Sequence, residues 1–188
     1  MRDPARIPIS RWIAVAAAAV LVACAAEPPE PAGLDALAAL RFMTGRWEGS
    51  AEGQAGTGMV AREYHFVLGG RYLLERNKTT YPPQERNKAG EVHEHWSLFS
   101  QDRVRNTLVL RQFHSEGFVN TYAFDAEASR DGKLVFESVA FENFDNRWRA
   151  RETYTIAPGG DALTETFELA SPGNAFGVYS VTRLHRAP

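Results

Sequence analysis

The chain has 188 residues, with 21 Lys and Arg against 23 Asp and Glu and a formal net charge of -2. That length gives room for one domain with a substantial buried core. The near-neutral balance lacks the cationic excess on which binding to nucleic-acid phosphates depends, so nucleic acid is not expected as a partner. An aromatic content of 11%, with 15 Gly and 10 Pro, favours strands and turns over a helical bundle.

The first residues have the pattern of a secretory signal. An apolar run over 12–22 follows three arginines, and it is shorter than the roughly 20 residues that a spanning helix needs. The run ends in Leu21-Val22-Ala23-Cys24, which resembles the lipobox of bacterial lipoproteins. The resemblance implies that residues 1–23 are a signal peptide and that Cys24, the only cysteine, is the lipidated residue of the mature chain. The alternative is an ordinary secretory signal that happens to contain a cysteine.

The segment after Cys24 is rich in Pro and Ala and predicts an extended tether over residues 24–33, followed by a domain over 34–188. Ala25 stands where many lipoproteins of the inner membrane carry Asp. By analogy, we expect a bacterial envelope protein that is anchored through lipid on Cys24 and faces the periplasm, in the outer membrane.

One short helix is predicted from Leu34 to about Phe42, because leucines recur there at helical spacing. From there on the apolar residues alternate with period two, and turn residues separate the runs. Ten strands are expected, over residues 46–52, 59–68, 71–81, 91–101, 107–114, 117–125, 133–141, 148–157, 162–170 and 177–186. An antiparallel meander of this length leaves open edges unless it closes, so an all-β up-and-down barrel is predicted, with a sandwich as the alternative.

Gly45-Arg46-Trp47 follows the predicted helix and opens the first strand. This arrangement resembles the G-x-W motif of the calycin superfamily, the lipocalins and fatty-acid-binding proteins. The resemblance implies that the helix plugs one barrel end and that Trp47 is structural. It also implies that a basic residue of the last strand, Arg183 or Arg186, packs across the indole. The ten-strand count is closer to fatty-acid-binding and nitrobindin-like barrels and to uncharacterised bacterial relatives.

Hairpin geometry assigns side chains to the two faces of the sheet, because residues that flank a two-residue turn are paired. The turns at Gly69-Gly70, at Glu116-Gly117 and over 158–161 give such assignments. The predicted interior is aromatic and charged, and a small-molecule site presents such a mixed lining. Its candidate ligand-binding residues are Arg62, Tyr64, Glu94, Trp96, Arg111, Asn120, Tyr122, Glu152, Tyr154 and Glu165. A network of ion pairs that only fixes the register is the alternative interpretation.

The segment 91–100, EVHEHWSLFS, looks at first like a metal motif. Read as a strand, it places Glu94 and Trp96 on one face and His93 and His95 on the other. The assigned faces put Glu94 and Trp96 inside, with Trp96 opposite Arg111. His93, His95 and His114 then form a group on the outer face, without carboxylates to orient the rings. A solvated histidine face is therefore expected, and no metal site.

No cofactor is expected, with haem as the alternative that the nitrobindin-like resemblance implies. That alternative is weakened because the inward series of the last strand, which includes Ser180 and Thr182, contains no histidine, while Tyr179 remains a candidate axial ligand. No catalytic residue is assigned, since no serine lies in a nucleophile elbow. Acid-base catalysis by a buried glutamate with Tyr154 stays open.

The sequence predicts an envelope lipoprotein whose barrel binds a small amphipathic or aromatic molecule, with Arg111 as the anchor of an anionic or carbonyl group. Two alternatives are a haem-binding, nitrobindin-like protein and an envelope interaction module whose barrel is filled by its own side chains.

Overall fold

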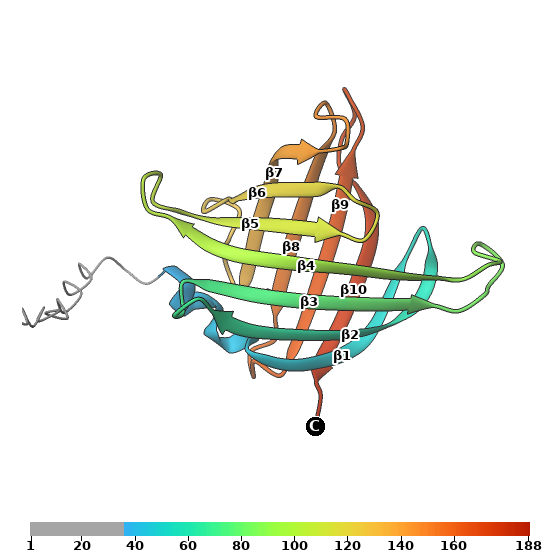
Figure 1. Cartoon of the computed structure of the whole chain (residues 1–188), viewed down its shortest axis with the longest axis horizontal. Coiled ribbons are helices and arrows are strands. Elements are labelled where there is room, and N and C mark those ends of the chain that lie inside the picture. Colours follow the sequence, from blue (N-terminus) through green and yellow to red (C-terminus); the bar gives the residue numbers. More distant parts are fainter. Residues whose placement is uncertain (1–35) are drawn as a thin grey trace, which may run out of the picture. The chain divides into compact units, whose positions relative to one another are not determined.

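The computed structural model describes residues 36–188, in which ten strands form a closed antiparallel barrel (Figure 1). A short 3-10 helix, η1 (Ala36–Met43), comes first. The strands are β1 (Gly45–Gly53), β2 (Gly56–Val67), β3 (Tyr72–Tyr81), β4 (Glu91–Asp102), β5 (Thr107–His114), β6 (Val119–Phe124), β7 (Lys133–Glu142), β8 (Arg149–Ile156), β9 (Ala162–Ala170) and β10 (Gly177–Arg186). Each pairs with its neighbours in sequence, and β1 pairs with β10. The barrel prediction is confirmed, and the sandwich is wrong.

The described residues belong to one compact unit. The expected signal peptide, Cys24 and the tether lie outside them. Within residues 36–188, no helix combines the length and the apolar character that crossing a bilayer requires.

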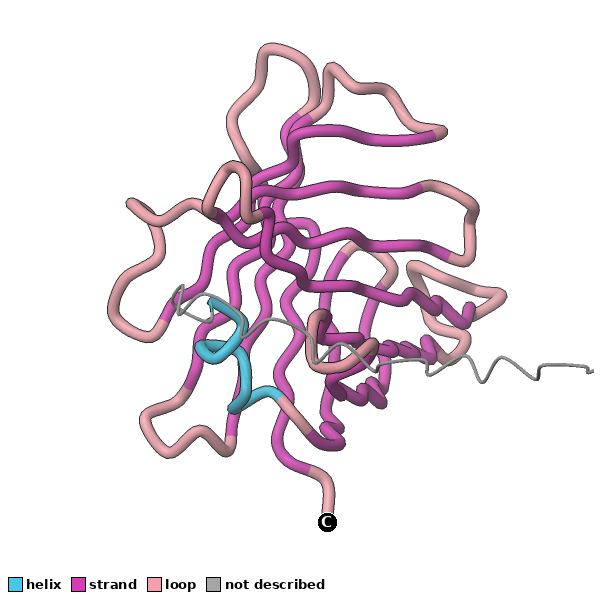
Figure 2. Tube along the Cα trace, turned by 60° about the vertical axis from the view of Figure 1, so that its left-hand side comes forward, coloured by secondary structure: helices cyan, strands magenta, loops and turns pink. Residues whose placement is uncertain are grey.

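The helix lies against one end of the barrel, where β1 begins and β10 ends (Figure 2). We call this the helix end. Its apolar side chains Leu37, Leu40 and Met43 are buried in the main hydrophobic core. The loops after β1, β3, β5, β7 and β9 gather at the opposite end, which we call the open end.

The inward side chains change character along the barrel. Near the helix end they are large and apolar, and Phe99, Phe136 and Tyr154 meet edge to face with ring centroids 5.7–6.1 Å apart. Toward the open end the inward side chains include polar groups, such as Gln112 on β5 and Asn120 on β6. Burial of the apolar half stabilises the folded state, because each fully buried large side chain contributes roughly 1.5–3 kcal/mol to the free energy of unfolding. The polar half positions the site.

Trp47 joins the helix to the barrel. Its indole Nε1 donates a hydrogen bond to the carbonyl of Met43, and the guanidinium carbon of Arg186 lies 4.6 Å from the ring centroid. Gly45 has a φ of 117°, a conformation that L side chains rarely adopt, and a Cβ there would lie 3.3 Å from Arg186. The basic residue over the tryptophan is therefore Arg186. Assigning Arg183 to this role is wrong, since Arg183 points outward and pairs with Glu52 at 3.5 Å.

Candidate functional site

A cavity of about 670 Å³ occupies the open half of the barrel. Its volume lies within the usual range of small-molecule sites, about 300–1,000 Å³. Its inner wall is polar and its rim is largely aromatic. The wall includes Arg62, Asn77, Thr79, His93, His95, Gln112, His114, Asn120, Glu152, Glu165 and Thr182, and the rim includes Phe118, Phe144, Trp148, Phe167 and Tyr179.

Seven of the ten candidate binding residues point into the barrel. Four of them line the cavity: Arg62, Asn120, Glu152 and Glu165. The other three are tyrosines buried inside the barrel: Tyr64, Tyr122 and Tyr154. The parity of the β2–β3 and β8–β9 hairpins is as predicted, with Arg62 opposite Asn77 and Glu152 opposite Phe167.

The other three candidates, Glu94, Trp96 and Arg111, lie on the outer surface, so the prediction that they face inward is wrong. Glu94 pairs with Lys78 on the neighbouring strand at 3.4 Å, and Trp96 is 53% exposed beneath the guanidinium of Arg76. Arg111 is exposed and reaches the hydroxyl of Ser100 at 3.3 Å. The expected anchor role of Arg111 inside the cavity has no geometric basis.

The error comes from one turn. The β5–β6 hairpin has a three-residue loop, Ser115 to Gly117, closed by a hydrogen bond from Gly117 N to His114 O at 2.9 Å. A two-residue loop pairs Phe113 with Asn120, whereas the structure pairs Gln112 with Asn120. Because side chains alternate, this slip of one residue exchanges the inward and outward faces of β5. The inward face of β4 changes as well, because β4 is paired with β5.

A buried ion network holds the centre of the cavity wall. Arg62 Nη2 donates to Glu165 Oε2 at 2.6 Å, and Arg62 Nε lies 3.2 Å from Glu75 Oε1. Asn77 Oδ1 and the hydroxyl of Tyr64 accept its other hydrogen bonds, at 2.9 and 3.1 Å. Burial alone favours the neutral form of Glu75, but Arg62 and a hydrogen bond from His95 outweigh it and lower the pKa of this carboxyl. Each of the three guanidinium nitrogens of Arg62 therefore has a protein partner.

Glu152 is a further acid of the wall. Burial, together with Glu165 and Glu75, raises its pKa well above the ordinary value. Gln112 donates a hydrogen bond to this carboxyl, yet Glu152 Oε2 has no partner. Oxygens of five further buried residues also lack a partner within residues 36–188: Glu75, Ser97, Gln112, Asn120 and Tyr154. Such atoms normally find a partner in a folded protein, and a bound molecule can supply it.

Three histidines gather on the cavity wall near the open end. His93 and His95 come from β4 and His114 from β5, and their ring centroids are 5.4–5.5 Å apart. The expectation that this group lies on the outer face without carboxylates is wrong on both points. His95 Nε2 lies 2.9 Å from Glu75 Oε1, and His93 Nδ1 lies 2.7 Å from Glu116 Oε1.

The turn between β5 and β6 contains a signal from which the inward position of these histidines is predictable. A two-residue type I′ turn requires positive φ at both residues, which suits Asn-Gly and not Glu-Gly. A three-residue hairpin with Gly at its last position is the better interpretation of Ser115-Glu116-Gly117, and Gly117 has a φ of 90°.

The last strand does not fit a haem of the kind that the nitrobindin-like resemblance implies. The inward side chains of β10 include Thr182 and Leu184, both buried, while His185 is exposed and lies 3.3 Å from Glu48. Tyr179 lies at the cavity rim and packs edge to face on Phe167, with centroids 5.5 Å apart.

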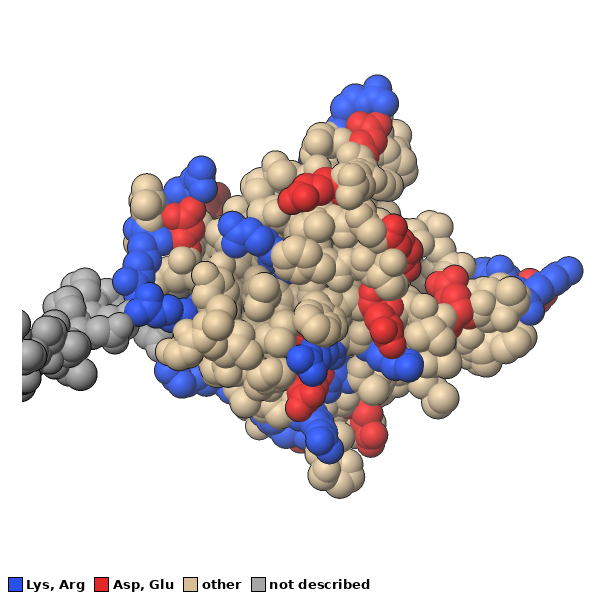
Figure 3. All heavy atoms as spheres, viewed as in Figure 1, with Lys and Arg blue, Asp and Glu red and all other residues tan. Residues whose placement is uncertain are grey.

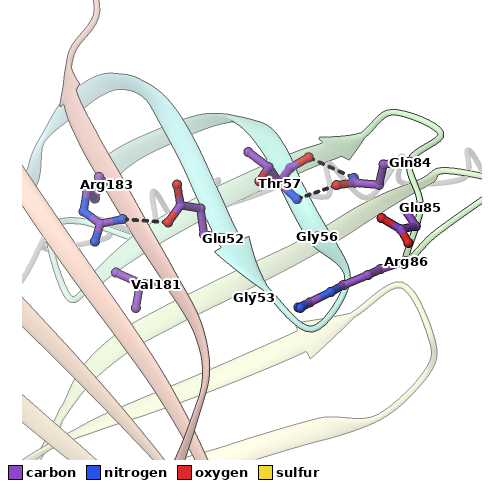
Figure 4. A pocket seen from close by; sticks show the side chains of 9 residues that line it. All are labelled: Glu52, Gly53, Gly56, Thr57, Gln84, Glu85, Arg86, Val181 and Arg183. Carbon is purple, nitrogen blue, oxygen red and sulfur yellow. Dashed lines mark hydrogen bonds and ion pairs between the residues drawn. The ribbon is translucent and has the colours of Figure 1, made fainter.

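A second hollow of about 570 Å³ lies on the outside, between the β1–β2 turn and the β3–β4 loop (Figure 4). Gln84, in the β3–β4 loop, forms two hydrogen bonds with the backbone of Thr57 on β2, at 2.9 and 3.0 Å. The charged groups drawn there are solvated, as in the pair of Glu52 with Arg183 (Figure 4). Without a buried unpaired group, this hollow is the weaker candidate for a site.

Charges of both signs occur on the face of the molecule shown in Figure 3, in keeping with the near-neutral composition. The fold and the cavity together define a closed ten-stranded antiparallel barrel with a polar internal site. No protein-family model and no curated protein matches the chain. Among solved structures, it is similar in fold to the crystal structure of Rv2717c from M. tuberculosis, with a TM-score of 0.58. Their sequences are 16% identical over 82% of this chain and 98% of that one.

Proposed function

We propose that the barrel binds a small molecule with an aromatic part and hydrogen-bond donors. The observation that supports this most is the open cavity with unpartnered polar atoms on its wall. The amide oxygen of Gln112 and Oε2 of Glu152 can both accept hydrogen bonds, and neither has a partner among the described residues. A ligand that supplies N–H or O–H groups satisfies these acceptors, while the aromatic rim covers its apolar part.

We further propose that the protein is a bacterial lipoprotein of the cell envelope, anchored through Cys24, facing the periplasm and sorted to the outer membrane. The lipobox-like segment and the tether support this proposal. Calycin membership, with the helix closing one barrel end, is supported by Gly45, Trp47 and the position of Arg186 over the indole.

Binding can be tested with N-phenyl-1-naphthylamine, a neutral aromatic amine whose fluorescence rises in an apolar site. We expect saturable binding of about one molecule per chain, as for a single cavity of this size. Ser180→Trp places a large side chain on the cavity wall, and Val181→Trp places the same side chain in the outer hollow. The first substitution should abolish the signal, and the second should leave it unchanged.

Circular dichroism would establish that both variants are folded. Equal binding by folded Ser180→Trp and Val181→Trp would contradict the proposal. Native mass spectrometry of the protein purified from its own membranes would then show whether a molecule of this chemistry accompanies the wild type and is absent from Ser180→Trp.

A further inference from the structure

The histidine cluster of His93, His95 and His114 has an arrangement that its own hydrogen bonds leave incomplete. One ring nitrogen from each histidine lies within 4.8 Å of those of the other two. The cluster lies on the wall of the cavity, so that a bound group has access from the solvent side. Its chemistry depends on which nitrogens carry hydrogen.

Two carboxylates determine which ring nitrogens of His93 and His95 carry hydrogen. Glu75 accepts a hydrogen bond from His95 Nε2 at 2.9 Å, and Glu116 accepts one from His93 Nδ1 at 2.7 Å. In a neutral imidazole only one nitrogen carries hydrogen. With both rings in the neutral form that binds a metal, the remaining nitrogens, His95 Nδ1 and His93 Nε2, present lone pairs, and they face each other at 3.4 Å. Two lone pairs at this distance repel unless a positive group lies between them.

The distance suits a metal ion. Two nitrogens that bind zinc tetrahedrally at about 2.0–2.1 Å lie about 3.4 Å apart. Histidines that bind metal commonly donate their other N–H to a carboxylate, and both histidines of β4 do so. The sequence predicts no carboxylate beside these rings, whereas the structure places one beside each of the two.

His114 completes the set. Its Nδ1 is buried without a partner, and its Nε2 lies 3.3 Å from the amide nitrogen of Asn120, whose Oδ1 is also unpartnered. Rotating the Asn120 amide by 180° lets Oδ1 accept a hydrogen bond from His114 Nε2, which leaves Nδ1 with a lone pair.

We propose that His93, His95 and His114 bind one divalent transition-metal ion of the zinc class, with one ring nitrogen each and the fourth position open to the cavity. Three neutral imidazoles suit zinc and its neighbours and disfavour magnesium and calcium, which prefer oxygen ligands. This inference goes beyond the proposed function. Metal binding needs no organic ligand, and the naphthylamine experiment needs no metal, so the two can fail separately.

The test is isothermal titration of the purified, chelator-treated protein with Zn²⁺, using a chain without a polyhistidine tag. We expect one ion per chain for the wild type and no binding of Mg²⁺. His93→Ala, which removes a partly exposed ligand, should weaken binding by at least about 100-fold, more than the loss of an outer partner does. His185→Ala removes a histidine that is exposed outside the cavity and should leave the affinity unchanged.

A matched pair of carboxylates tests the orientation of the rings. Glu116→Gln should weaken Zn²⁺ binding by about 10- to 100-fold, as the loss of a carboxylate that orients a metal-binding histidine does. Glu94→Gln lies between the two histidines in sequence but on the outer face, and it should have no effect. Zn²⁺ should also raise the melting temperature of the wild type and not of His93→Ala. Equal affinity of the wild type and His93→Ala, or no Zn²⁺ binding by folded wild type, would overturn the proposal.

Discussion

Glu152 is buried in the cavity wall next to two other acids, Glu75 and Glu165, while Arg62 is the cation of this network. Arg62 pairs with both of those acids, and Glu152 keeps an unpartnered oxygen. A buried carboxyl in this position favours its protonated form, which can donate a hydrogen bond as well as accept one. Glu152 is thus the wall residue best suited to exchange a proton or a hydrogen bond with a bound molecule.

The raised pKa of Glu152 predicts a dependence of stability on pH. The folded state binds this proton more tightly than the unfolded state, so the group costs stability as the pH rises above about 4.5, its unperturbed value. Glu152→Gln removes that cost. We expect the variant to be more stable than the wild type at pH 8, by about 1–3 kcal/mol, the cost of an unsatisfied buried group. Urea unfolding at pH 5 and pH 8 measures this.

The advantage of Glu152→Gln should shrink at pH 5. The matched control is Glu94→Gln, which changes an exposed carboxylate and should lie within about 0.5 kcal/mol of the wild type at both values of pH. A gain that is the same at both pH values would contradict the argument.

The strands themselves are well predicted by the sequence, because period two and turn residues report local backbone preferences. The sequence predicts the inward faces of β8 and β9 correctly, since the opposite face is plainly polar. It predicts the wrong inward faces for β4 and β5. Trp96 looked like a cavity residue, but apolar aromatics also occur on outer surfaces, where Arg76 covers this one. The length of the β5–β6 turn determines which faces of β4 and β5 point inward. It therefore also determines whether the histidine cluster lies inside or outside the barrel.

The helix and the last strand are coupled through Arg186. Its guanidinium lies over Trp47, Nη1 donates to Thr44 O at 2.9 Å, and Nη2 donates to Phe42 O. Arg186→Ala should lower the free energy of unfolding by about 1–2 kcal/mol, the sum of a cation-π contact and hydrogen bonds made by a charged group near the surface. Arg183→Ala removes only an exposed ion pair and should cost about 0.5 kcal/mol or less.

Urea unfolding followed by circular dichroism compares the two arginine variants. Similar losses for both would show that the contacts of Arg186 with the helix contribute little, and a larger loss for Arg183→Ala would reverse the assignment.

For the molecule as a whole, the proposed anchor is separate in sequence from the barrel. Cys24→Ala should move the protein from the membrane fraction to the soluble fraction of the cell, because two or more acyl chains give stable attachment and none remain in the variant. The barrel should fold and bind naphthylamine as before. Mass spectrometry of the N-terminal peptide of the wild type checks for lipid, and membrane retention of Cys24→Ala would contradict lipidation at this residue.

The closing pair of strands also sets an order of events during synthesis. Trp47 on β1 lies opposite Arg186, and β10 is the last strand to be made. Until it emerges, β1 and β9 both present unpaired edges that can join another chain. Closure requires contacts over nearly the whole domain, which is the slow kind of pairing in folding. Any truncation that removes β10 therefore leaves an open sheet, so the pairing of β10 with β1 is what removes these edges.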